Sequence, residues 1–131
     1  MVSKAYVPDA GDFVWLTFDP QAGQEQRGRR PALILSPRVY NAKAGLALAC
    51  PVTSHVKGYP FEVVIPTGSP VAGAVLCDHL KSLDWRERRA EFAARALEEL
   101  LTDVYDCVIA ILDALRMYDT CLCSKDWLKF V

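Results

Sequence analysis

One carboxylate and three guanidinium groups lie close together in a polar segment of this sequence. Glu25 is followed by Arg27, Arg29 and Arg30, and Gly28 separates the first two arginines. A guanidinium group donates paired hydrogen bonds to phosphate oxygens and stays charged at any physiological pH. A carboxylate beside it can accept a proton or a hydrogen bond from a nucleobase. This combination indicates a site for a phosphodiester.

A second polar segment lies about twenty residues further along the chain and contains Thr53, Lys57, Tyr59 and Phe61. The Thr53 hydroxyl can hold a phosphate oxygen or align a reacting hydroxyl, and the Lys57 ammonium can contact a flanking phosphate. Tyr59 and Phe61 can stack on unpaired bases. Each residue also has a simpler interpretation. Thr53 suits a turn, Lys57 a hairpin turn with Gly58, and the two aromatic side chains suit a core.

Two histidines and an aspartate are further candidates. His55 and His79 would form an acid–base pair of the ribonuclease type if the fold brought them together, because imidazole titrates near neutral pH. Asp78 lies beside His79 at the end of an apolar run and is a secondary candidate. A basic cluster follows at Arg86, Arg88 and Arg89. It fits either a solvated edge or a track for RNA.

Six short segments rich in apolar and β-branched residues are predicted to be the strands that position these side chains. They cover 13–18, 31–36, 47–52, 61–65, 73–77 and 81–85. The charged segment 21–30 has no apolar period and is expected to be an exposed, mobile loop.

An amphipathic helix is predicted after the strands, over 97–115, because apolar residues recur there at three- and four-residue steps with acidic residues between them. No clean N-cap precedes it. Short strands joined by brief turns and followed by one helix predict a mainly β fold with α. We expect a small antiparallel barrel or sandwich with a C-terminal helix that closes or flanks it.

The length of 131 residues and the hydrophobic content of 52% predict one globular domain. We assign this domain to 1–116 and regard 117–131 as a C-terminal extension of unknown role. The net charge of −1 does not by itself favour nucleic-acid binding. The charge is uneven, however, with seven basic against four acidic residues over 1–60 and four against eight over 91–131. A basic first half can bind a polyanion locally.

The five cysteines are an odd number without C-x-x-C spacing, and no apolar signal stands at the N-terminus. Both observations favour a reducing cytoplasm. Cys50 and Cys77 lie in apolar runs and are expected to be buried. Cys121 and Cys123 lack a nearby histidine and make a poor metal site. We therefore expect no metal cofactor. No apolar run approaches the roughly 20 residues that cross a bilayer, so we expect no membrane span either.

In its motifs the chain resembles the MazF/PemK family of bacterial toxins from residue 1 to about residue 115. The matching motifs include G-R-R-P at 28–31, P-V-T at 51–53, K-G-Y-P-F at 57–61 and D-H-L-K-S-L-D-W at 78–85. The resemblance implies an SH3-like barrel with a terminal helix, a homodimer, and a metal-independent endoribonuclease that cuts single-stranded mRNA at short motifs. It also implies a MazE-like antitoxin whose acidic tail covers the active site. Residues 117–131 extend beyond the usual family end.

The resemblance also implies roles for individual residues. Arg30 corresponds to the arginine that is essential for cleavage, Thr53 to the threonine of the P-x-T motif, and Glu25 to the glutamate ahead of the arginine. In such a site the ribose 2′-OH attacks its own phosphate, so Arg30 would stabilise the added negative charge and Thr53 would align the reacting groups. Glu25 would either take the 2′ proton or bind a base edge. The candidates for RNA contact are Lys57, Arg29, Arg27, Tyr59, Phe61, Asp78 and His79.

Two other functions are compatible with the predicted fold class. CcdB-like toxins use the same barrel to poison DNA gyrase without cutting RNA, and they do so through the C-terminal helix and tail. A passive nucleic-acid module would bind RNA with salt-dependent affinity and release it uncut. The candidate residues cluster in the two polar loops and not at the C-terminus, which favours the nuclease.

Overall fold

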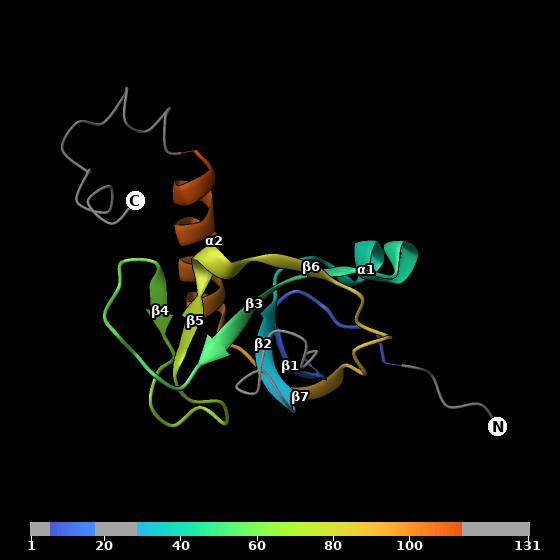
Figure 1. Ribbon diagram of the computed structural model, residues 1–131, viewed down its shortest axis with the longest axis horizontal. Helices are drawn as coiled ribbons and strands as arrows, with labels where there is room; N and C mark the ends of the chain where they lie inside the picture. The colour runs from blue at the N-terminus through green and yellow to red at the C-terminus, as the bar shows by residue number, and fades with distance from the viewer. Residues whose placement is uncertain (1–5, 18–28, 114–131) are drawn as a thin grey trace, which may run out of the picture.

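Seven short strands and a C-terminal helix form most of the structure, a computed structural model that describes residues 6–17 and 29–113 (Figure 1). In chain order the elements are β1 (Asp12–Thr17), β2 (Arg29–Ile34), α1 (Arg38–Ala44), β3 (Ala47–Thr53), β4 (Glu62–Val64), β5 (Ala74–Leu76), the 3-10 turn η2 (Cys77–His79), β6 (Lys81–Leu83), β7 (Glu91–Arg95) and α2 (Glu98–Leu112).

The strands form one antiparallel sheet in the order β4-β5-β3-β2-β1-β7, and β6 joins it through β3. β3 therefore has three partners. Its first residues pair with β6, its middle residues with β2, and its last two, Val52 and Thr53, with β5. Within the described residues β4 and β7 are the two edges, so the barrel is open. The prediction of a mainly β, antiparallel, barrel-like fold with a C-terminal helix is confirmed.

Each face of the sheet carries its own hydrophobic cluster, because successive side chains of a strand point to opposite faces. On one face Phe13, Leu33 and Cys50 pack with Val104 of α2. On the other face Ala32 and other strand residues pack around Trp85; the cluster contains Val14, Leu16, Ala32, Ile34, Ala47, Ala49, Leu83 and Trp85. The indole N–H of Trp85 donates to the carbonyl of Asn41, which ties α1 to this second cluster.

Helix α2 packs against the first cluster through one apolar stripe. Leu100, Val104 and Val108 are buried at four-residue steps, as expected for an amphipathic helix. Leu97 occupies the N-cap without a side-chain hydrogen bond, in agreement with the absence of a cap signal in the sequence. The Tyr105 hydroxyl donates to the carbonyl of Leu35 at 2.6 Å and anchors the helix to the end of β2.

Several elements differ from the sequence prediction. Residues 29 and 30 begin β2 and do not belong to the preceding loop. Helix α1, the turn η2 and strand β7 had not been predicted. Lys57 and Gly58 do not form a hairpin, because β3 and β4, which flank them, both pair with β5 and not with each other. The domain limit at 116 stays a prediction, since 114–131 lie outside the described residues.

Candidate active site

Arg29 and Arg30 lie at the start of β2 on opposite faces of the sheet. Arg30 pairs with Leu16 of β1 and shares its face with Ala32. Arg29 pairs with Thr17, on the face that carries Leu33. Adjacent arginines on one strand therefore meet different surroundings, as the alternation of a strand requires.

Arg30 and Thr53 lie at the ends of two neighbouring strands. β2 and β3 pair with Ala32 opposite Pro51 and Leu33 opposite Cys50. Pro31 has no N–H to donate, and the pairing between the strands ends at the next residue, Ala32. Continuing the register from that pair brings Arg30 opposite Thr53, and strand alternation puts both side chains on the face of the Trp85 cluster.

The Arg30 guanidinium has no bonding partner within the described part of the chain. No hydrogen bond or ion pair joins it to any residue of 6–17 or 29–113, and the side chain is only partly buried. A guanidinium without an internal acceptor is available to an anionic ligand. Arg30 therefore lies at the candidate site, carries a positive charge and is accessible to an anionic ligand.

Thr53 is held in place by its own turn and by β5. Its hydroxyl oxygen accepts a hydrogen bond from the backbone N–H of His55 at 3.1 Å, which leaves the hydroxyl proton available for donation. Gly73, just before β5, approaches the Thr53 carbonyl so closely that an added Cβ would lie 2.0 Å from its oxygen. Gly73 also has a φ of +119°, which favours glycine. Sequence reasoning missed this glycine, whose role depends on the contact between β3 and β5.

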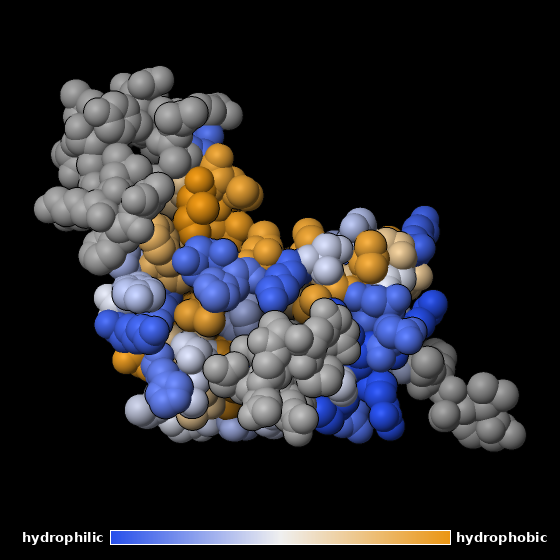
Figure 2. All heavy atoms as spheres, in the orientation of Figure 1, coloured by the Kyte–Doolittle hydropathy of each residue, from blue (hydrophilic) through white to orange (hydrophobic). Residues whose placement is uncertain are grey.

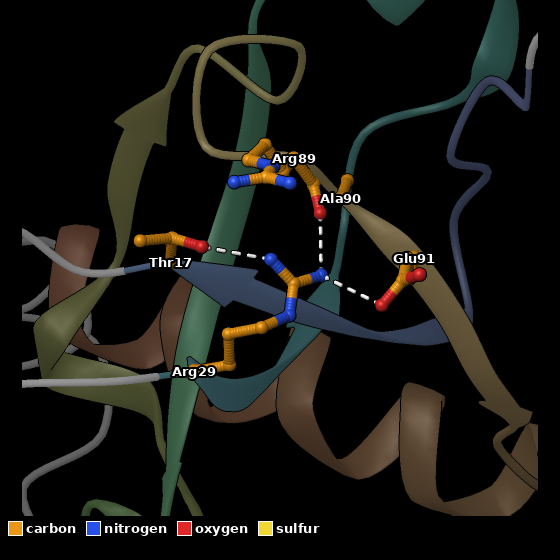
Figure 3. A pocket seen from close by; sticks show the side chains of 5 residues that line it. All are labelled: Thr17, Arg29, Arg89, Ala90 and Glu91. Carbon is orange, nitrogen blue, oxygen red and sulfur yellow. Dashed lines mark hydrogen bonds and ion pairs between the residues drawn. The ribbon is translucent and has the colours of Figure 1, made fainter.

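Arg29, in contrast, is bound by its own protein. It lies in a shallow pocket between Thr17, Arg89 and Glu91 (Figure 3). One guanidinium nitrogen donates to the Thr17 hydroxyl at 2.7 Å. The other lies within hydrogen-bonding distance of the carbonyls of Trp15 and Arg89 and of the Glu91 carboxylate, 3.1 Å away. Arg29 therefore connects β2 to β1 and to the segment leading into β7, whereas its assignment to RNA contact stays a prediction.

Replacing Arg29 with alanine should lower the free energy of unfolding by about 1–2 kcal/mol, because it removes hydrogen bonds that join β1, β2 and β7. Chemical denaturation followed by tryptophan fluorescence measures the change. Glu91→Gln is the matched control. It removes only the exposed ion pair and should cost about 0.5 kcal/mol. Wild-type stability of Arg29→Ala would contradict this structural role.

The loop that carries Lys57 is organised by a carboxylate that sequence reasoning had not assigned. Glu62 accepts hydrogen bonds from the backbone N–H groups of Lys57 and Gly58, at 3.0 and 3.1 Å. The Lys57 ammonium lies 5.7 Å from the centre of the Tyr59 ring, a cation–π contact. Lys57 and Tyr59 are exposed, so this aromatic side chain is not part of the core. Phe61 is partly buried, and its carbonyl accepts from the N–H of Cys77.

Asp78 and His79 occupy η2, directly after β5. The imidazole Nε2 of His79 lies 3.8 Å from a carboxylate oxygen of Asp78, and both side chains are substantially exposed. No contact in the described structure joins His79 to His55, which is exposed in the loop after β3. The two histidines therefore do not form a hydrogen-bonded pair here.

The basic cluster after Trp85 has internal contacts. The Arg86 guanidinium lies 4.7 Å from the centre of the Trp85 ring, and Arg88 donates to the Thr17 carbonyl at 3.2 Å. Arg89 has a φ of +58°, unusual for a residue other than glycine, and its carbonyl accepts from Arg29. These contacts join the cluster to Trp85 and to β1, whereas the solvated edge and the track for RNA both stay predictions.

Two of the predicted site residues, Glu25 and Arg27, lie outside the described residues. Within 6–17 and 29–113, no three His, Cys, Asp or Glu side chains converge as a metal site. In the same ranges no helix has the length and apolar character needed to cross a membrane.

Comparison with known proteins gives a consistent result at three levels. Residues 9–112 match the family model described as the PemK-like, MazF-like toxin of type II toxin–antitoxin systems. The endoribonuclease toxin MazF of Escherichia coli strain K12 is 53% identical over 90 residues, which span 69% of this chain and 79% of that protein. The endoribonuclease PemK of Escherichia coli is 33% identical over 104 residues, or 76% of this chain and 78% of that protein.

Solved structures agree with these sequence matches. The crystal structure of MazF from Deinococcus radiodurans superposes with a TM-score of 0.76 at 58% identity, covering 82% of this chain and 98% of that chain. A MazE–MazF crystal structure from the same organism gives a TM-score of 0.75 at 53% identity, over 82% of this chain and 97% of the other.

Proposed function

Because this chain belongs to the PemK-like, MazF-like family of toxins of type II toxin–antitoxin systems, we propose that it is a toxin that acts as an endoribonuclease. Its substrate is single-stranded mRNA, which it cleaves at a short sequence motif without a metal ion. The relatives named above are endoribonucleases, and none of them supports the CcdB-like alternative of a gyrase-binding toxin.

The reaction uses a nucleophile that belongs to the RNA. The ribose 2′-OH loses its proton and attacks the adjacent phosphorus, the bond to the 5′ oxygen breaks, and that oxygen takes up a proton. The products are a 2′,3′-cyclic phosphate and a 5′-OH. Arg30 donates two hydrogen bonds to the non-bridging oxygens as their negative charge increases. Thr53 donates its hydroxyl proton to a phosphate oxygen or aligns the 2′-OH, and Glu25 takes the 2′ proton or binds a base edge.

The observation that supports this proposal most strongly is the register of β2 and β3. The last pair of that register is Ala32 with Pro51. Extended by two residues along each strand, it puts Arg30, which has no acceptor in the described structure, and Thr53, whose hydroxyl proton is available, on one face of the sheet. Lys57 and Tyr59, both exposed in the loop after Thr53, extend the surface along which an RNA strand would lie. Phosphate contact by Lys57 and base stacking on Tyr59 are the roles that we assign to them.

Incubation of the purified protein with a long single-stranded RNA in EDTA tests this function. We expect discrete fragments whose 5′ ends carry a hydroxyl and whose 3′ ends resist ligation until the cyclic phosphate is removed. Sequencing of the fragment ends gives the motif. RNA that binds but stays intact would favour the passive module, and cleavage that requires a divalent metal would exclude the proposed mechanism.

The partners follow from the same family. One solved relative is a complex of MazF with MazE, and an antitoxin of that kind is the protein partner that we assign to this chain. We further assign a homodimer that acts in the cytoplasm. Exposed apolar side chains on α2, among them Ile109 and Leu112, leave surface for a partner to cover (Figure 2). Light scattering of the protein alone, and after addition of a MazE-like protein, measures both assemblies.

A further inference from the structure

The loop between β3 and β4 carries the exposed side chains to which the proposed function assigns contact with RNA. Residues 54–60 are all exposed. Both ends of the loop are fixed by β5, which lies between β3 and β4 in the sheet (Figure 1). Thr53, before the loop, pairs with Ala74, and Glu62, after it, pairs with Leu76. One strand therefore sets where the loop leaves the sheet and where it returns.

A single carboxylate oxygen holds the middle of this loop. Oε1 of Glu62 accepts hydrogen bonds from the backbone N–H groups of Lys57 and Gly58, at 3.0 and 3.1 Å. The backbone N–H of Glu62 donates in turn to the Tyr59 carbonyl at 3.1 Å. Gly58 has a φ of +81°, a conformation that glycine adopts without strain. The first residue of β4 thus anchors the backbone on which Lys57 and Tyr59 are carried.

We propose that Glu62 is a positioning residue, whose carboxylate holds the loop so that the Lys57 ammonium and the Tyr59 ring are presented together to the RNA strand. This inference rests on the proposed function. The two groups form one unit, because the ammonium lies 5.7 Å from the centre of the ring. A loop that must first be ordered when RNA arrives lowers the affinity by the entropy of that ordering. Glu62 acts by removing this cost and touches no reacting atom.

The charge of Glu62 separates this role from direct contact with the RNA backbone. A carboxylate repels phosphate groups, so loss of its negative charge alone should strengthen the binding of a polyanion. Loss of its hydrogen-bond acceptor should weaken binding, because the loop is released. The two effects have opposite signs, and substitutions at this one position can separate them.

Three substitutions of Glu62 separate the charge from the reach of the side chain. Glu62→Gln removes the charge and keeps an oxygen in place. Because both N–H groups converge on one oxygen, the amide carbonyl can accept both hydrogen bonds. Glu62→Asp keeps the charge and withdraws the oxygen by one methylene group. Glu62→Ala removes both the charge and the acceptor.

Steady-state cleavage of a defined oligonucleotide in EDTA gives the test. Glu62→Asp and Glu62→Ala should raise KM by on the order of tenfold and change kcat by less than about twofold, because the lost interaction serves binding and not the chemical step. Glu62→Gln, the matched control, should keep KM within about twofold of wild type or lower it. Adding Glu62→Asp to Lys57→Ala should raise KM little further, because both changes affect the same contact.

Hydrogen exchange in the protein without RNA provides a second measurement. The amides of Lys57 and Gly58 should be protected in wild type and in Glu62→Gln, and should exchange rapidly in Glu62→Asp and Glu62→Ala. The aspartate and glutamine variants decide the question even if Glu62→Ala folds poorly.

Rapid exchange of both amides in wild type would overturn the proposal, and so would a loss of kcat at unchanged KM. Equal increases of KM in Glu62→Gln and Glu62→Asp would also overturn it. Wild-type protein that leaves RNA intact would refute the proposed function, and this role with it. Cleavage by wild type with an unchanged KM in Glu62→Asp and Glu62→Ala would refute the role of Glu62 alone.

Discussion

Replacement of Arg30 with alanine should reduce the rate of RNA cleavage by on the order of 10²-fold or more, while the stability of the protein stays close to that of wild type. The rate falls because the transition state loses a donor to its non-bridging oxygens. The stability is retained because no described residue accepts a hydrogen bond from this guanidinium. Single-turnover cleavage of a defined oligonucleotide and denaturant unfolding measure the two effects separately.

Arg30→Lys and Arg29→Ala are the informative controls. Lysine keeps the charge but not the planar fork, so it should recover only part of the lost rate. Arg29→Ala should show the reverse pattern. Its free energy of unfolding should fall more than that of Arg30→Ala, and its cleavage rate should fall less, because Arg29 is bound to Thr17 and Glu91. Undiminished cleavage by Arg30→Ala would remove the main support for the proposed mechanism.

Among the glycines that the structure describes, Gly73 is the one whose replacement with alanine should most damage both fold and activity. The new Cβ would lie 2.0 Å from the Thr53 carbonyl oxygen, and the φ of +119° is strained for any other residue. We expect the free energy of unfolding to fall by about 3 kcal/mol. Because β5 or Thr53 must shift to relieve the overlap, cleavage should also fall by on the order of 10²-fold. Thermal unfolding and the cleavage assay measure these losses.

Gly45→Ala is the matched control for this change. Gly45 also has a positive φ, +73°, but no atom lies within 4 Å of the position of its Cβ. Its replacement should therefore cost about 1 kcal/mol and leave cleavage intact. If both alanine variants were equally stable, the close approach of Gly73 to Thr53 would be wrong.

The sequence predicted the elements that carry strong apolar patterns. The runs over 31–36 and 47–52 correspond to β2 and β3, and the helix expected over 97–115 is α2. Helix α1 was missed because it buries only Asn41 and so has no apolar period. Its flanking Pro37 and Gly45 are start and stop signals that would have revealed it. Strand β7 was missed because it buries only Ala94 and depends on pairing with the distant β1.

The candidate site was only partly accessible to sequence reasoning. Motif resemblance selected Arg30 and Thr53, but the difference between Arg29 and Arg30 follows from the alternation of β2, which had been predicted to begin at residue 31. The partners of Arg29 come from β1 and from the segment around Arg89, about sixty residues away. No local pattern encodes such a contact, because it exists only when β7 lies beside β1.

The three pairings of β3 also bear on the stage of synthesis at which the chain can become active. A ribosome that has released 53 residues has already produced Arg30 and Thr53, yet β5, which holds the end of β3, has not been synthesised. The third partner of β3, β6, and the helix that covers the first cluster come later still. We therefore expect RNA cleavage only from chains synthesised beyond α2, and fragments that end before β5 should be inactive in the cleavage assay.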